Sequence, residues 1–170
     1  NVKILDVGSG HGLFKEMLLK EGYNNIDEIP DESHTDLSFD KIKSSDNKYD
    51  VITAWEVVEH LENPHNFIRE AYRVLKRGGI LIVSMPNPFH IISRLLFLKR
   101  GNMPRWNKRN NHIYVFTRDL IYKLFDQFEL IATKYHLGEL TYGIFKKFDG
   151  KYPENQWFGH FIIFIFKKDE

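Results

Sequence analysis

Three glycines alternate with polar residues directly after a short apolar run near the start of the chain. Asp6 and Val7 close that run, and Gly8, Gly10 and Gly12 follow at every second position. Glycine lets a backbone turn sharply with positive φ and approach a ligand closely. A helix that opens after such a turn presents free amide groups and a partial positive charge. The spacing therefore predicts a small-molecule site at this turn.

The spacing of these glycines argues against two common nucleotide sites. The phosphate-binding loop of nucleoside triphosphate hydrolases needs lysine and a hydroxyl residue after its last glycine, whereas Leu13 follows Gly12. The dinucleotide fingerprint needs its third glycine at position 13, one residue later than this chain has it. A nicotinamide-dependent oxidoreductase is therefore disfavoured. The plain alternative is a tight structural turn without a ligand.

Strands and helices alternate along the sequence, which favours an α/β fold. Apolar runs predict strands over residues 2–7, 24–29, 49–54, 80–85, 129–135 and 160–166. Helical spacing predicts helices over 13–21, from Pro64 to about Leu75, over 89–97 and after Thr117. Gly78 and Gly79 are expected to end the second of these helices, and Leu120 is expected to face inward. The glycine turn would then join the first strand to the first helix.

Size and composition fit one globular domain spanning residues 1–170. Of the 170 residues, 42% are hydrophobic and 28% are charged, which is enough for a packed core. The sequence has no cysteine, which excludes disulfides and cysteine-ligated metals. No apolar run is long enough to span a membrane and no secretory leader is visible, so we expect a cytoplasmic protein. Because its first residues already have the pattern of a strand, we also expect a preceding N-terminal segment.

Positive charge is concentrated in the middle of the chain, although the formal net charge is only +1. Residues 1–70 hold 15 acids and 7 bases, whereas residues 71–118 hold 10 bases and no acid. Residues 119–170 hold 8 acids and 7 bases. A segment of one sign suits an anionic substrate, and the plain alternative is a solvated basic surface.

Four motifs in order resemble the class I S-adenosylmethionine-dependent methyltransferases of the type 11/23 group. They are Ile4 to Gly12, Tyr49 to Leu61, Tyr72 to Asn87, and His112 with Phe116 and Thr117. The resemblance implies a Rossmann-like fold with a seven-stranded, mostly parallel sheet, an antiparallel last strand and helices on both faces. It also implies S-adenosylmethionine as methyl donor and S-adenosylhomocysteine as product.

The resemblance places the cofactor at the ends of the first strands. The residues that it implies are Asp6, Gly8, Ser9, Gly10, Gly12, Glu28, Asp36, Leu37, Trp55 and Glu56. Glu28 would accept hydrogen bonds from the ribose diol, with Asp27 and Asp31 as alternatives. Asp36 and Leu37 would contact the adenine. Few residues separate Glu28 from Asp36, so the helix and strand that the family has between them must be shortened or lost.

A methyl acceptor that must lose a proton needs a base, and His60 is the predicted one. An imidazole titrates near neutrality, and His60 follows a strand near the edge where such sheets bind ligands. The alternative is a structural hydrogen-bonding role for this histidine. We expect no metal, because the eight histidines are scattered along the chain.

Residues 86–118 are predicted to form an insert that covers the acceptor, with Asn87, His90 and His112 as candidate acceptor contacts. The segment is first amphipathic and then basic and aromatic, which suits a small acceptor, including an anionic one, that is methylated at oxygen or nitrogen. It would also suit contact with an anionic membrane surface. Two alternatives stay open. One is an RNA methyltransferase that uses residues 94–118, although the near-neutral chain argues against nucleic acid. The other is a non-catalytic domain that keeps the fold.

Overall fold

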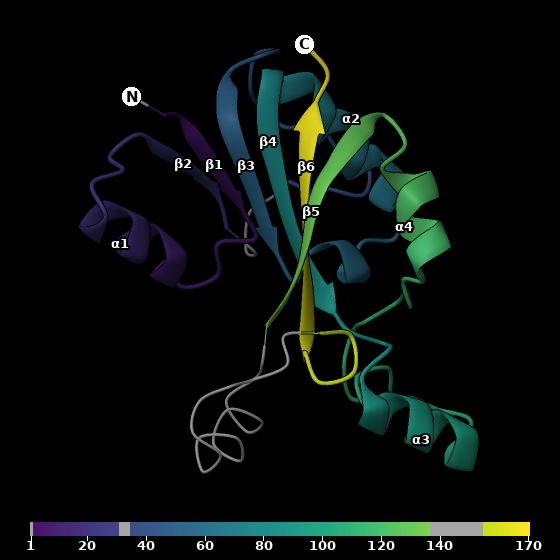
Figure 1. The fold of residues 1–170 in the computed structure, drawn as a ribbon. Helices are drawn as coiled ribbons and strands as arrows, with labels where there is room; N and C mark the ends of the chain where they lie inside the picture. The colour runs from purple at the N-terminus through teal and green to yellow at the C-terminus, as the bar shows by residue number, and fades with distance from the viewer. Residues whose placement is uncertain (1, 31–34, 137–154) are drawn as a thin grey trace.

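The computed structural model describes residues 2–30, 35–136 and 155–170, and they form a sheet with the strand order β2-β1-β3-β4-β6-β5 (Figure 1). The strands are β1 (Ile4–Val7), β2 (Ile26–Ile29), β3 (Tyr49–Trp55), β4 (Leu75–Pro86), β5 (Phe128–His136) and β6 (Phe161–Lys168). The helices are α1 (Leu13–Lys20), α2 (Pro64–Val74), α3 (Ile91–Arg100) and α4 (Arg118–Leu124), with a short 3₁₀ turn, η1 (Val58–His60). The expected alternation of strands and helices is confirmed.

The sheet is mostly parallel. β1 pairs in parallel with β2 and β3, and β3 pairs in parallel with β4. The last strand, β6, lies antiparallel between β4 and β5, as the resemblance implied. The expectation of seven strands is not met, because the described residues form six. The described part of the connection from β2 to β3, residues 35–48, contains only turns, so no further strand extends the sheet there.

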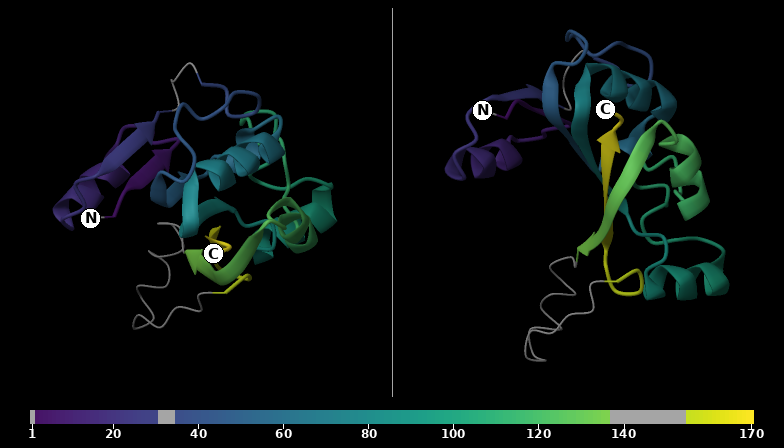
Figure 2. Two further views of the ribbon diagram at one scale, coloured as in Figure 1. Left: turned by 90° about the horizontal axis from the view of Figure 1, so that it is seen from above. Right: turned by 45° about the horizontal axis from the view of Figure 1, so that its top comes forward.

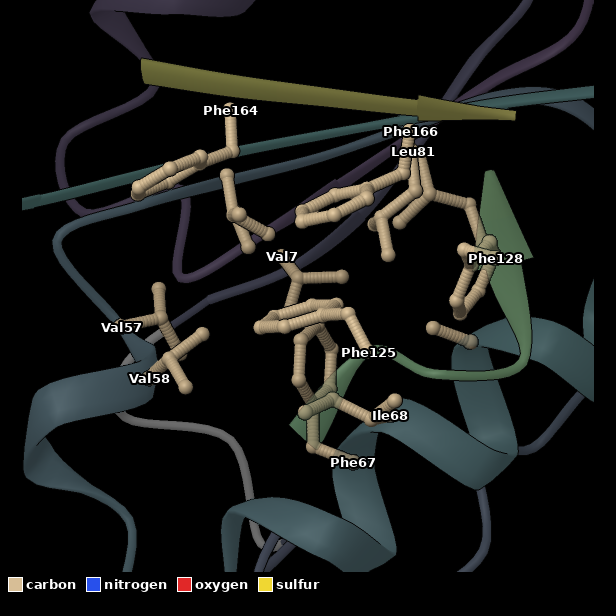
Figure 3. Packing of buried hydrophobic residues seen from close by; sticks show 14 of the residues in the cluster. Val7, Val57, Val58, Phe67, Ile68, Leu81, Phe125, Phe128, Phe164 and Phe166 are labelled. Atoms are coloured by element: carbon tan, nitrogen blue, oxygen red, sulfur yellow. The ribbon is translucent and has the colours of Figure 1, made fainter. Parts of the chain in front are cut away.

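One face of the sheet is covered by α2 and α4. Helix α1 lies beside β1 and β2, away from α2 and α4 (Figure 2). Side chains from α2, α4 and the strands fill the space beneath that cover. Phe67 and Ile68 of α2 point toward the sheet, and Phe125 lies between them and Phe166 of β6 (Figure 3). The rings of Phe125 and Phe166 stack with centroids 4.4 Å apart. Burial of large apolar side chains here is the main force that holds the sheet in place.

The opposite side of the molecule is more thinly covered. No residue of α1 is buried, and Leu13 and Met17 are 67% and 62% exposed.

Leu120 of α4 is 37% exposed, which contradicts the expectation that it faces inward. It occupies the first turn of α4, where Thr117 caps the helix by accepting a hydrogen bond from the Leu120 amide. The helix begins after Thr117 as expected, but Leu120 lies in its exposed first turn.

β4 begins five residues earlier than its apolar run predicts. Leu75 was expected on the stripe of α2, but the helix ends at Val74 and Leu75 already pairs with Tyr49 of β3. The register then shifts between Tyr49 and Val51, and Gly78 has a φ of +70° there. A Cβ at Gly79 would lie 2.8 Å from Leu75 Cγ, so this position needs a glycine for space. The two glycines therefore bend a strand and do not terminate a helix.

Candidate functional site

The parallel strands β1 and β3 end at a cavity of about 560 Å³. This volume lies within the range of roughly 300–1,000 Å³ that is typical of small-ligand pockets. Of the predicted site residues, the cavity is lined by Gly8, Asp36, Leu37, Trp55, Glu56 and His60. It lies where α/β sheets bind ligands, outside the carboxyl ends of their parallel strands.

The glycine turn has the backbone that its sequence predicts. Gly8, Gly10 and Gly12 have φ values of 70°, 50° and 75°, in the left-handed region that favours glycine. The Gly8 amide donates to the Ile29 carbonyl oxygen at 2.8 Å, which ties the turn to the end of β2. Behind the turn, Asp6 is fully buried and accepts a hydrogen bond of 2.6 Å from the Thr53 hydroxyl. Asp6 therefore fixes β1 to β3 directly below the turn.

Glu28 is the described acid that lies beside the glycine turn. Neighbouring residues of a strand point to opposite faces, so the side chains of Glu28 and Asp27 extend from opposite faces of β2. A Glu28 carboxylate oxygen lies 3.6 Å from the position of a Cβ on Gly12, and Glu28 also pairs with Lys15 of α1. Asp31, the third candidate, lies outside the described residues.

Asp27 belongs to an ion-pair network on the other side of β2. Its carboxylate lies 3.3 Å from Lys3 Nζ and 3.0 Å from Lys48 Nζ, and it accepts from the Tyr49 hydroxyl at 2.8 Å. Burial alone would raise the pKa of Asp27, but hydrogen bonds from Lys48, Tyr49 and Lys3 hold it below its ordinary value. The Asp27 carboxylate therefore has a structural role, because its contacts are with residues of the protein itself.

Asp36 and Leu37 form the rim of the cavity opposite the glycine turn. Asp36 is exposed, and its side chain accepts from the Ser38 amide at 2.8 Å. The Leu37 carbonyl oxygen accepts from the Asn66 side chain, which ties this loop to α2. Ser38 is buried and accepts from the Glu62 amide at 3.0 Å. The loop is thus held in place without a regular helix or strand.

Trp55 and Glu56 stand where β3 ends. The buried Nε1 of Trp55 has no hydrogen-bond partner in the described part of the chain. Glu56 has a φ of +54°, a strained backbone that is uncommon for a non-glycine residue. Its carboxylate accepts from the Ser84 hydroxyl at 3.2 Å and lies 3.7 Å from Arg105 Nη1. Burial raises the pKa of Glu56 to about 7, against the opposing effects of Arg105 and Ser84.

A cluster of Glu59, His60 and His112 adjoins this position. Their potential ligand atoms all lie within 4.8 Å of one another, and the two imidazole centroids are 4.7 Å apart. Glu59 is fully buried, and among the described residues neither of its carboxylate oxygens has a hydrogen-bond partner. Burial raises its pKa to about 8, and the charge of Glu56 adds to the effect. One carboxylate and two imidazoles are a ligand set that suits a divalent transition metal.

The cluster forms because the segment after α3 folds back onto η1. The Ile113 amide donates to the Glu59 carbonyl oxygen at 2.8 Å, and the Tyr114 hydroxyl donates to the Glu62 carbonyl oxygen at 3.0 Å. These bonds place His112 beside His60. Burial lowers the pKa of His112, and His60 lowers it further. Spacing along the sequence could not reveal this meeting, because 51 residues separate His60 from the carbonyl of Asn111 that approaches its Nδ1.

Asn87 and His90, predicted as acceptor contacts, do not line the cavity. Asn87 is buried, and its side-chain amide donates to the carbonyl oxygens of Gln156 and Gly159. His90 caps α3 by accepting from the Ile92 amide, and its ring lies 4.6 Å from that of His160. Both side chains hold the start of α3 against the approach to β6.

The comparison with known proteins agrees with this geometry. A family model described as a methyltransferase domain matches residues 1–133. The chain belongs to the methyltransferase domain family. The ubiquinone biosynthesis O-methyltransferase of Rickettsia bellii is 30% identical over 130 residues, which make up 67% of this chain and 54% of that protein. The chain thus spans about half the length of the curated relatives that it matches.

Solved structures support the methyltransferase fold. A putative methyltransferase from Bacillus halodurans superposes with a TM-score of 0.64 at 16% identity, covering 100% of this chain and 94% of that one. A SAM-dependent methyltransferase from Archaeoglobus fulgidus gives a TM-score of 0.64 at 18% identity, covering 98% and 86%. At these identities the likeness concerns the fold, which is Rossmann-like. Of the helices that the structure describes, none has the length and apolar character to cross a membrane.

Proposed function

We propose that this chain carries an S-adenosylmethionine-dependent transfer of a methyl group to an oxygen atom of a small acceptor. The observation that carries the proposal is the position of the cavity. It lies between the glycine turn and the end of β3, beside the cluster of Glu59, His60 and His112. Oxygen is chosen as the acceptor atom because the curated relatives are named as O-methyltransferases.

The residues around the cavity fit S-adenosylmethionine. The glycines at positions 8 and 10 leave room for a ligand to approach the backbone closely, and Glu28 offers a carboxylate to a ribose diol. Trp55 Nε1 is a buried donor that lacks a partner in the described chain, so a bound ligand could supply its acceptor. Asp36 and Leu37 would lie against the adenine. When bound, the cofactor supplies an electrophilic methyl group on a sulfonium.

The protein's own contribution would be to position the acceptor, exclude water and receive a proton. In this proposal residues 1–170 form one domain, and residues 86–118 form the insert over the acceptor. The bonds from Ile113 and Tyr114 to η1 support that placement. Holding the acceptor in line with the methyl group accounts for most of the expected rate gain.

We further propose that Glu59, His60 and His112 hold a divalent cation. This departs from the sequence expectation of no metal, which considered only spacing along the chain. A cation would compensate the buried Glu59 carboxylate, whose oxygens lack partners among the described residues. Bound there, it would lower the pKa of an acceptor hydroxyl. His60 would then act as a ligand, whereas in a metal-free enzyme it would be the base.

Calorimetric titration with S-adenosylhomocysteine, with NAD as control, tests the first part of the proposal. We expect S-adenosylhomocysteine to bind and NAD not to bind. Transfer to catechol, followed by mass spectrometry in the presence of EDTA or Mn²⁺, tests the second part. Loss of activity in EDTA and its return with Mn²⁺ would support the cation. Activity that survives EDTA but is lost in His60→Asn would assign the proton transfer to His60 itself.

Related experiments would distinguish two alternative functions. Salt-sensitive binding of RNA by residues 94–118, with transfer to RNA and not to catechol, would favour an RNA methyltransferase. Cofactor binding without transfer to any acceptor would favour a non-catalytic domain. Absence of cofactor binding in a folded sample would contradict the proposal as a whole.

A further inference from the structure

Arg105 has an unusual position for a residue of a surface loop. Its side chain is only 30% exposed, and its guanidinium carbon lies 4.2 Å from the ring centroid of Phe161, the first residue of β6. The loop around it is internally bonded: Trp106 Nε1 donates to the Tyr114 carbonyl oxygen at 2.6 Å, and the Asn110 side chain donates to the Arg105 carbonyl oxygen. The guanidinium is therefore held against the end of the sheet.

The donors of this guanidinium are largely unfilled. In the described residues its side chain makes one ion pair, to Glu56 at 3.7 Å, and no hydrogen bond. Arg73 is about equally exposed, yet it donates to Glu70 and Asp46 and to the carbonyl oxygens of Ile42 and Ser44. A guanidinium carries five N–H donors in a planar fork that matches a carboxylate or a phosphate. Because the Arg105 side chain is 30% exposed, an oxyanion from outside the protein can reach these donors.

The groups that face Arg105 do not neutralise it fully. Its charge acts on Glu56 and Glu59 and on three histidines, His90, His112 and His160. Glu56 is the ion-pair partner of Arg105 among the described residues, at 3.7 Å, and burial raises the pKa of this carboxyl group to about 7. The guanidinium itself keeps its positive charge throughout the pH range in which these groups titrate.

We propose that Arg105 binds an anionic group of the methyl acceptor, a carboxylate or a phosphate, through its guanidinium fork. The inference rests on the proposed function. Glu56 lines the cavity and contacts Arg105, so an acceptor that enters beside Glu56 meets the guanidinium directly. Bidentate pairing with an oxyanion fills the empty donors and fixes the orientation of the acceptor as well as its charge.

A small anion fits this position better than a polyanion or a membrane. Arg105 is partly enclosed and rests on an aromatic ring, whereas Lys99, Arg100, Lys108 and Arg109 are exposed to solvent. Those four side chains are free to meet a long anionic surface. The partly buried guanidinium of Arg105 can contact one anionic group at a time, and that group must approach it closely.

Matched acceptors test the inference. We would compare 3,4-dihydroxybenzoate with its neutral amide, 3,4-dihydroxybenzamide, in wild type, Arg105→Gln, Arg105→Lys and Arg109→Gln. For the benzoate we expect Arg105→Gln to raise KM by about tenfold or more, because hydrogen bonds to charged groups are the strong ones. We expect little change for the amide, partial recovery in Arg105→Lys, and wild-type behaviour in the exposed control Arg109→Gln.

Binding alone gives a readout that does not depend on methyl transfer. Benzoate and phenyl phosphate would be titrated by ligand-observed NMR, which also tells a carboxylate site from a phosphate site. Cofactor competence would be followed separately with S-adenosylhomocysteine, and folding by thermal unfolding. If S-adenosylhomocysteine binds but neither anion depends on Arg105, the inference is overturned and the proposed function stands. If the anions depend on Arg105 but S-adenosylhomocysteine does not bind, the anion site stands and the proposed function fails.

Discussion

We propose different roles for two adjacent carboxylates on β2, and a pair of variants can separate them. Glu28 lies beside the glycine turn, whereas Asp27 is bound by Lys3, Lys48 and Tyr49. We expect Glu28→Ala to weaken S-adenosylhomocysteine binding by roughly tenfold, the loss of one charge-assisted hydrogen bond. Calorimetry at constant pH measures it. Asp27→Asn is the matched control, and it should keep the affinity while lowering stability by about 1 kcal/mol. Equal effects on affinity would contradict the assignment.

Lys168 and Lys167 form a second matched pair, at the end of β6. Lys168 is 7% exposed, and its Nζ donates to the carbonyl oxygens of Tyr72 and Leu75, both at 2.7 Å, and to the Asn47 side chain. Lys167 is more exposed and has an ion pair of 3.5 Å with Glu170. We expect Lys168→Met to lower the free energy of unfolding by about 2–3 kcal/mol, because two carbonyl groups at the end of α2 lose their donor. Urea unfolding should show less than about 1 kcal/mol for Lys167→Met.

At the scale of single residues, the sequence predicted what local geometry dictates. The left-handed glycine turn follows from positions within one strand-turn-helix unit, so its spacing carried enough information, whereas the role of Glu28 on β2 stays a prediction. The meeting of His60 with His112 depends on the path of a segment after α3, and no local pattern encodes that path. In the sequence, nothing distinguishes Arg105 from the other basic residues of its segment. What distinguishes it is an aromatic ring from β6, far along the chain.

The exposed side of α3 is the clearest unpartnered feature at the scale of an element. Ile92, Leu95 and Leu98 are 53%, 58% and 82% exposed, and Lys99 and Arg100 follow at the end of the helix. An amphipathic helix with basic neighbours suits the surface of an anionic bilayer. We expect co-sedimentation with phosphatidylglycerol vesicles, weaker in high salt and weaker in Leu98→Glu. Leu13→Glu, an exposed site on α1, is the control. Equal binding of both variants would contradict a role for α3.

Elements were easier to predict than their ends or their number. Each described strand and helix coincides with an expected one, because apolar periodicity reflects which side faces the core. The start of β4 was missed because Leu75 satisfies both a helical stripe and a strand. The seventh strand was expected from the resemblance alone. The short distance between Glu28 and Asp36 already argued against it, and the described residues 35–48 contain only turns.

At the scale of the whole molecule, two buried carboxyl groups should make stability depend on pH. Glu59 is fully buried, and its pKa is raised from 4.5 to about 8, while that of Glu56 is raised to about 7. At these two groups the folded protein therefore binds more protons than the unfolded chain, for Glu59 between pH 4.5 and 8, whereas the lowered pKa values of His90, His112 and His160 act in the opposite direction. The stability that the two carboxyl groups contribute then falls as the pH rises through this window. In EDTA, we expect a loss on the order of 2 kcal/mol between pH 5 and pH 8.

A cation in the cluster would reverse that trend, since it binds the ionised carboxylate and the neutral imidazoles that higher pH favours. Adding Mn²⁺ or Zn²⁺ should therefore raise the melting temperature more at pH 8 than at pH 5, by mass action on the folded state. Glu59→Gln keeps the shape of the side chain but cannot ionise, so it should flatten the pH dependence in EDTA and lose most of the metal effect. Thermal unfolding of both proteins across this range measures the two effects together. A wild type with the same slope as Glu59→Gln would mean that Glu59 is not the titrating group. A metal effect that persists in Glu59→Gln would place the cation elsewhere.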